Sequence, residues 1–305
     1  MEKSGIEENA ISNLISSLNI NEENQKEFRD QMIDIANKKR ISIHKNKFVD
    51  WAFLVHDFNR MHVFSGYAEE AGFKRTPMHG TLISACEEQY ALGILEILKK
   101  YTGKELFYNA HEIKFENPLF PAIIKAKAYW SLEETVVDEN NICLNVSSIH
   151  GKEKKFISSK IVFGYNQNKE EPQEIINFLS GDNIVHKTSI EIKEGEREHF
   201  YEILGEKPIE EVSMMHVGAL VPATLLELAS RRTGRPEGTY RTIDFKFYNK
   251  PAPGIFETSL KMSRPLRNLQ GKAFLYKFEA LCIQDKKIIL TGEVGCISPT
   301  EYKLN

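Results

Sequence analysis

The sequence predicts an α+β fold of two tandem units, each with an antiparallel sheet wrapped around one long central helix. Each half of the chain contains one long helical pattern, and the first of these carries apolar residues on more than one side, as buried helices do. A series of strand-like runs follows each helical pattern. Similar residues also recur in the two halves at a nearly constant distance along the chain, which indicates a tandem repeat.

The composition is that of a globular protein of 305 residues, 41% hydrophobic and 27% charged, with a net charge of −3. This balance implies no basic face, so we expect no nucleic-acid partner. The four cysteines form no CxxC pair, which argues against a structural zinc site. The chain shows neither an apolar core of signal-peptide type nor a run of about 18 apolar residues. We therefore expect a cytoplasmic protein that does not contact the membrane.

Residues 1–40 are predicted to form a helical extension, because Ile11, Leu14, Ile15 and Leu18 recur at helical spacing. The pattern indicates no function for this segment.

The first unit is assigned to residues 41–165. A short helical pattern at 45–57 places Asp57 at its C-terminal end. The long helical pattern runs from 82 to 100 and is expected to end at Gly103, because glycine readily adopts the left-handed conformation that closes a helix. Strand-like runs follow, at 112–115, 122–132, 141–149 and 156–163.

The second unit is assigned to residues 186–305, after a linker at 166–185 that contains a polar stretch ending in Pro172. A short helical pattern at 174–179 falls within this linker. The second unit repeats the plan of the first, with helical patterns at 197–204 and 219–232 and strand-like runs at 240–248, 254–262, 274–283 and 287–294.

The repeat is visible in individual residues. Gly103 corresponds to Gly234 at an offset of 131 (234 − 103), and Asn117 corresponds to Asn249 at an offset of 132 (249 − 117). Two fused units of this kind can join edge to edge into one longer sheet. We then expect Phe115 of the first unit to be equivalent to Phe247 of the second.

The residues that can carry chemistry lie between Asp57 and Leu82. Asp57 and His62 are five positions apart on a turn-like segment, and they can act on one water molecule as base and acid. His79 and Gly80 open the long helix, where the Gly80 amide can stabilise negative charge on a carbonyl oxygen. These groups are suited to adding or removing water next to a thioester carbonyl.

This segment resembles the motif of MaoC-like, R-specific 2-enoyl-CoA hydratases. In that motif an Asp-x-Asn-Pro-x-His element precedes Gly/Ala-Phe and then a His-Gly-Met-Leu helix start. The matching residues are Asp57, Asn59, His62, Phe73, His79, Gly80 and Leu82. The resemblance implies the hot dog fold, a curved antiparallel sheet around a central helix. Together with the internal repeat it implies a double hot dog.

The resemblance also implies three catalytic residues, Asp57, His62 and Gly80, and three substrate-binding residues, Asn59, Phe73 and His79. The expected reaction is the reversible hydration of trans-2-enoyl-CoA to (R)-3-hydroxyacyl-CoA. No metal and no cofactor beyond the thioester carrier is implied. Acyl-CoA is the expected substrate, and acyl carrier protein is an alternative carrier. Whether the chain forms a homodimer is a question that the sequence leaves open.

Some residues depart from the family pattern. Arg60 replaces the usual proline, and Phe64 stands where an acidic residue is common. The second unit has no Asp…His pair before Gly218 and offers only Glu206, Glu210, Glu211 and His216, so we expect it to be non-catalytic.

Two other functions therefore stay open: a 3-hydroxyacyl-ACP dehydratase of fatty-acid or polyketide synthesis, and an inactive acyl-thioester-binding protein. Arg231, Arg232 and Arg235 fit either a solvated helix end or a contact with CoA phosphates.

Overall fold

The computed structural model describes residues 8–38, 40–70, 72–120, 125–150, 154–169, 178, 184–221, 239–262, 266–267 and 274–298. Within these ranges one eleven-stranded sheet forms, with the order β1-β3-β4-β5-β2-β7-β11-β10-β8-β6, and β9 pairs with β10. All the pairings are antiparallel. The α+β class is therefore confirmed, but the two predicted sheets are one continuous sheet.

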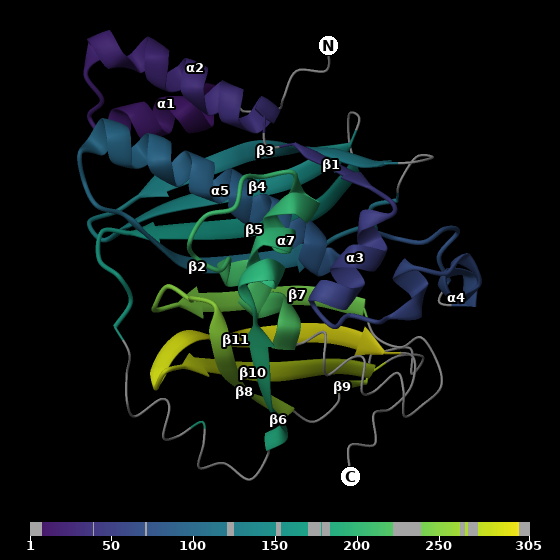
Figure 1. Ribbon diagram of the computed structural model, residues 1–305. Coiled ribbons are helices and arrows are strands. Elements are labelled where there is room, and N and C mark those ends of the chain that lie inside the picture. Colours follow the sequence, from purple (N-terminus) through teal and green to yellow (C-terminus); the bar gives the residue numbers. More distant parts are fainter. Residues whose placement is uncertain are drawn as a thin grey trace.

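The first half of the sheet consists of five strands, β1 (Ile41–His44), β2 (Phe107–Phe115), β3 (Lys125–Val137), β4 (Asn141–His150) and β5 (Lys154–Gly164). Helix α5 (Gly80–Thr102) lies across these strands, as Figure 1 shows. Thirteen of its residues are buried, which agrees with the apolar pattern. Its C-cap is Gly103, with φ 64° and ψ 13°, so the predicted helix end is confirmed.

The predicted N-terminal extension contains helices α1 (Glu8–Ser17) and α2 (Glu22–Lys38). In Figure 1 they lie on the outer side of α5 and β3. Ile35 of α2 packs against Gly93 of α5, and the Thr135 hydroxyl of β3 donates a hydrogen bond to the Ala10 carbonyl at 3.0 Å. The extension therefore covers the core of the first half.

The second half of the sheet consists of β6 (Ile184–Ile192), β7 (Thr239–Phe247), β8 (Gly254–Met262), β9 (Leu266–Arg267), β10 (Phe274–Gln284) and β11 (Lys287–Ser298). Helix α7 (Glu194–Leu204) precedes a second central helix, of which residues 214–221 are described. This helix begins five residues before the predicted start at Ala219 (219 − 214), because the Glu88 side chain of α5 accepts a hydrogen bond from the Met214 amide at 2.9 Å. The rest of the predicted helix at 219–232 lies outside the described residues, as does nearly all of the pattern at 174–179.

The two halves join where β2 pairs with β7, with Ile113 opposite Ile243. Phe115 and Phe247 lie in these corresponding strands. However, the glycines of the two central helices contact different rings. Gly80 at the start of α5 packs against Phe115, whereas Gly218 in the second central helix packs against Phe245. Both glycines allow a helix to approach the central strands closely.

Several elements differ from the sequence prediction. Edge strands β1 and β6 were not predicted, and β2 begins at Phe107 instead of residue 112. The short helix predicted at 45–57 is α3 (Lys47–Leu54), so Asp57 lies three residues beyond its end instead of within it. The 3-10 turn η1 (Arg60–His62) and helix α4 (Ser65–Glu70) follow and were not predicted. No helix among the described residues is long and apolar enough to cross a membrane.

Candidate active site

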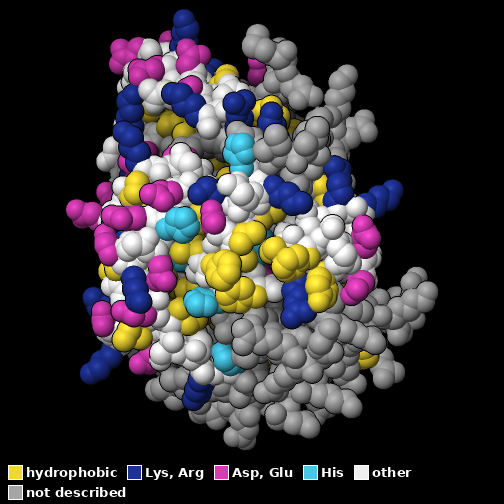
Figure 2. Space-filling model, turned by 45° about the vertical axis from the view of Figure 1, so that its right-hand side comes forward, with side chains coloured by type: hydrophobic (Ala, Val, Ile, Leu, Met, Phe, Trp, Pro, Cys, Tyr) yellow, Lys and Arg dark blue, Asp and Glu magenta, His cyan; other side chains and the backbone are white. Residues whose placement is uncertain are grey.

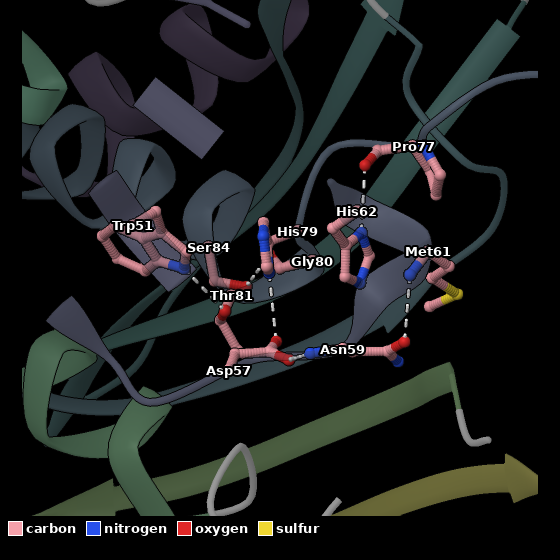
Figure 3. A network of polar contacts seen from close by, with 10 residues as sticks. All are labelled: Trp51, Asp57, Asn59, Met61, His62, Pro77, His79, Gly80, Thr81 and Ser84. Atoms are coloured by element: carbon pink, nitrogen blue, oxygen red, sulfur yellow. Dashed lines mark hydrogen bonds and ion pairs between the residues drawn. The ribbon is translucent and has the colours of Figure 1, made fainter. Parts of the chain in front are cut away.

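Two short side-chain turns shape the segment that carries the Asp-x-Asn-x-x-His element. His56, two residues after the end of α3, has a left-handed backbone with φ 56°, which turns the chain into Asp57. The Asp57 Oδ1 atom accepts a hydrogen bond from the Asn59 amide at 3.3 Å, and Asn59 Oδ1 accepts one from the Met61 amide at 3.4 Å. Asp and Asn favour such bonds to the backbone two residues ahead. The spacing of this motif therefore folds locally and brings His62 back beside Asp57 (Figure 3).

His62 is held as a neutral imidazole. Its Nδ1 atom lies 3.0 Å from the Pro77 carbonyl oxygen, which can only accept, so Nδ1 carries the proton and Nε2 presents a lone pair. Burial, together with neighbouring His79, lowers the pKa of His62 to about 3. At neutral pH the ring is therefore uncharged, and its unprotonated Nε2 atom can accept a hydrogen bond from water.

His79 connects the two motif residues. Its Nδ1 atom donates to Asp57 Oδ2 at 3.1 Å, and its ring stacks on His62 with centroids 4.0 Å apart. Burial by itself would raise the pKa of Asp57, but the nearby His79 and His62 hold it below its ordinary value. The side chain that contacts the carboxylate directly is therefore His79, which the sequence assigned to substrate binding.

The three side chains lie close together. One nitrogen or oxygen atom from each of Asp57, His62 and His79 lies within 4.8 Å of the others, and all three residues are buried. By distance this set can hold either one water molecule or a metal ion.

The helix start supplies backbone donors beside this group. Gly80 is the first residue of α5, and the preceding His79 makes no side-chain cap. The first amides of a helix have no partner within the helix, so they can receive negative charge. The Trp51 indole of α3 donates to the Thr81 hydroxyl at 3.1 Å and so fixes α3 against this end of α5.

A pocket of about 110 Å³ opens next to these groups. Four of the six predicted site residues line it: Asn59, His62, Phe73 and Gly80. Asp57 and His79, which are 1% and 0% exposed, are not among its lining residues. His62 therefore faces the pocket, and the Asp57–His79 pair supports it.

The second half of the chain completes the pocket with Thr239, Tyr240 and Arg241 at the start of β7. Arg241 is exposed and forms a β-bulge, because β7 pairs with β11 through Tyr240 and Thr242 and skips Arg241. Sequence reasoning missed this residue, because its place at the first site depends on the pairing of β7 with β2, which no local pattern specifies. Arg231, Arg232 and Arg235 lie outside the described residues.

The pocket-lining residues Asn59, Met61 and His62 lie in the chain between α3 and α4, and these two helices come forward on the face that Figure 2 shows. Figure 2 shows hydrophobic side chains gathered in the middle of this face, with basic side chains nearby. Two of the most exposed large hydrophobic residues come from this region, Phe53 in α3 (66%) and Phe64 before α4 (56%). Lys74 and Arg75 lie on the loop between lining residues Phe73 and Pro77.

The second half offers no equivalent acid–histidine pair among the described residues. His216 is buried and stacks on Phe200 at 4.8 Å, and its Nδ1 atom has no hydrogen-bond partner in the part of the chain that the structure describes. Burial, with His56 nearby, lowers its pKa to about 3. Glu211 accepts a hydrogen bond from Lys250 at 2.6 Å.

No protein-family model and no curated protein matches this chain. Among solved structures, it is similar to one described as a MaoC domain protein dehydratase from Chloroflexus aurantiacus, with 8% identity, a TM-score of 0.60, and coverage of 86% of this chain and 95% of that chain. It is similar to a MaoC-like dehydratase from Phytophthora capsici with 8% identity, a TM-score of 0.53, and coverage of 86% and 94%. A Mycobacterium tuberculosis protein described as having a double hot dog fold gives 10% identity, a TM-score of 0.54, and coverage of 85% and 93%. The chain therefore has the fold of the hot dog proteins.

Proposed function

We propose that this protein is a double hot dog hydro-lyase that adds water to trans-2-enoyl thioesters to form (R)-3-hydroxyacyl thioesters, and catalyses the reverse dehydration. One observation carries this proposal: a neutral His62 lines the pocket next to the uncapped start of α5. The Nε2 atom of this histidine has a free lone pair, because Nδ1 carries the proton. The similar MaoC-like structures add support through the fold that they share.

One water molecule between Asp57 and His62 is the proposed reactant. Groups within 4.8 Å of one another can both accept a hydrogen bond from the same water. The water then has both hydrogens engaged, and its oxygen lone pair points at C3 of the enoyl group. His62 takes the proton as the oxygen adds, and returns it to C2 on the same face. The Asp57 carboxylate, with its lowered pKa, stabilises the imidazolium that forms.

The thioester oxygen is placed at the start of α5 in this scheme. Addition of water to C3 moves negative charge onto that oxygen, and the Gly80 amide can donate to it. A well-placed backbone donor contributes about 3 kcal/mol to such a transition state. The same donor would also fix the thioester, and hence the face of the double bond that meets the water.

The proposal is tested by incubating the full chain with crotonyl-CoA and separating the enantiomers of the product. We expect (R)-3-hydroxybutyryl-CoA. Release of free CoA without hydration would identify a thioesterase and contradict the proposal. Parallel assays with crotonyl-CoA and crotonyl-acyl carrier protein decide between the two carriers.

The pocket size predicts a preference for short acyl chains. Its volume of about 110 Å³ is below the range of about 300–1,000 Å³ that is typical of sites for whole small ligands. We therefore expect a higher kcat/KM with crotonyl-CoA than with trans-2-decenoyl-CoA. A series of even-numbered enoyl-CoA substrates measures this, and a kcat/KM that rises steadily with chain length would contradict it.

Arg241 is proposed to contact the anionic part of the carrier. Arg241→Ala should raise KM for crotonyl-CoA about three- to tenfold with little change in kcat, because an exposed ion pair contributes modestly to ground-state binding. The effect should shrink as salt increases. Lys246→Ala is the matched control, since this exposed residue is on the same strand but not among the pocket residues. An equal rise in KM in both variants would contradict a specific contact between Arg241 and the carrier.

A further inference from the structure

Two neighbouring glutamates, Glu87 and Glu88, are buried in the middle of α5, and the proposed mechanism uses neither of them. Glu87 has its partners within the first half, where its carboxylate bonds the Ser159 hydroxyl and, at 3.0 Å, His111 Nε2. Glu88 instead reaches the second half of the chain. A buried carboxylate is costly unless its oxygens are paired, so the partners of Glu88 show what this side chain holds in place.

Glu88 caps the start of the second central helix. Its carboxylate accepts hydrogen bonds from the Ser213 hydroxyl and from the amides of Met214 and Met215, the latter two at 2.9 and 3.3 Å. The first amides of a helix have no partner within the helix, and a carboxylate is favourable at this end. One side chain of the first half therefore satisfies the start of a helix that belongs to the second half.

Helix α5 also carries the proposed thioester donor. Gly80, its first residue, lines the first pocket, and Glu88 follows eight residues later (88 − 80). This distance is just over two turns of one helix, which moves as a rigid unit. The second half is therefore bonded to the same element that places the Gly80 amide.

The second central helix packs closely on strand β7. A Cβ atom added at Gly218 would lie 2.6 Å from the ring of Phe245, so only a glycine allows this approach. The same strand carries Tyr240 and Arg241 into the first pocket. A displacement of the helix would be passed on to β7, because tightly packed elements leave no free space between them.

The pocket residues of β7 lie beyond the strand pairing that joins the two halves. β2 pairs with residues 242–246 of β7, whereas Tyr240 pairs with Cys296 of β11, which belongs to the second half. The halves also meet where Trp51 of α3 contacts Phe200 of α7, with ring centroids 5.5 Å apart. This contact is apolar and has little directional preference, whereas the hydrogen bonds of the buried carboxylate fix both distance and direction.

We propose that Glu88 is a positioning residue of the first site. By bonding the start of the second central helix to α5, it sets how β7 meets the first pocket and so holds Arg241 where the carrier binds. The kinetic consequence rests on the proposed function, but the contacts can be tested without turnover. Glu88 should affect carrier binding and not the chemical step, because Asp57, His62 and Gly80 all belong to the first half.

Two substitutions of similar size separate the hydrogen bonds of Glu88 from its volume. Burial raises the pKa of Glu88 to about 7, so the folded protein accommodates a neutral side chain at this position. Glu88→Gln keeps an acceptor oxygen, whereas Glu88→Met removes both acceptors. We expect Glu88→Met to raise KM for crotonyl-CoA about three- to tenfold with kcat changed less than about twofold, and Glu88→Gln to keep KM within about twofold of the wild-type value.

A double-variant cycle tests whether Glu88 acts through Arg241. The effects of Glu88→Met and Arg241→Ala on KM should not multiply, because the first substitution already displaces the side chain that the second removes. Effects that multiply, or an equal rise in KM in Glu88→Gln, would overturn the proposal. Glu96→Ala is the matched control, since it removes an exposed carboxylate from the same helix and should leave KM unchanged.

Hydrogen exchange tests the contacts without any turnover. In the wild type the Met214 and Met215 amides should be protected, although first-turn amides have no helical partner. In Glu88→Met these amides and residues 239–241 should exchange at least about tenfold faster, while residues 57–62 stay unchanged.

Two exchange results would overturn the proposal. One is rapid exchange of the Met214 and Met215 amides in the wild type, a measurement that does not depend on the folding of any variant. The other is exchange at residues 239–241 that is the same in Glu88→Met and in the wild type. Absence of crotonyl-CoA hydration by the wild type would refute the proposed function, whereas the exchange rates would still decide whether Glu88 holds the β7 segment.

Discussion

His62→Ala should lower kcat for enoyl-thioester hydration by about two to four orders of magnitude, the usual contribution of a positioned acid–base group. His62 is 6% exposed and contacts the protein through Nδ1 and Pro77, so its removal leaves a small cavity and one unpaired carbonyl. His62→Gln provides a second variant that can retain a hydrogen bond to Pro77. Circular dichroism should show both variants folded, while steady-state kinetics with crotonyl-CoA shows the loss of rate.

The pH profile tests the protonation state of His62. Its pKa of about 3 keeps the ring neutral, which is the proton-accepting form, at every pH above that value. An unperturbed histidine, with a pKa of about 6.5, would lose this form on acidification from neutral pH. We therefore expect kcat/KM to stay flat from about pH 8 to about pH 5. A decline centred near an ordinary histidine pKa would contradict this protonation state.

Asp57→Asn should also lower kcat by about two to four orders of magnitude, although the new side chain is nearly isosteric. The carboxylate accepts hydrogen bonds from the Asn59 amide and from His79 Nδ1, and a neutral amide cannot stabilise an imidazolium. Near-wild-type turnover of enoyl-CoA by this variant would refute the assignment. Asp50→Asn in α3 is the matched control, because Asp50 forms only a partly exposed ion pair with Lys47 at 3.3 Å among the described residues.

The double variant Asp57→Asn/His62→Ala tests whether the two residues act on one water. Groups that act as a unit are strongly non-additive, so the double variant should lose little more rate than the worse single variant. Losses that multiply would show two independent functions. His79→Gln extends the test: if His79 only orients Asp57, its rate loss should be smaller than that of Asp57→Asn and should disappear in an Asp57→Asn background.

The sequence by itself determined the features that depend on neighbouring residues. The end of α5 at Gly103 follows from the ability of glycine to adopt positive φ, and the turn from Asp57 to His62 follows from Asp and Asn accepting bonds two residues ahead. The repeat also follows from the letters, since fused units keep their spacing. Together these predicted the α+β class, with edge-to-edge joining of the two halves as one possible arrangement.

Only the tertiary structure decided which distant groups meet. It placed His79 on Asp57 and left His62 facing the pocket, and it brought the bulged Arg241 from the second half into the first site. It also placed Glu88 at the start of the second central helix, 125 residues away from Ser213. Such pairings depend on strand register and on the approach of packed elements, which a local pattern of apolar and polar residues does not specify.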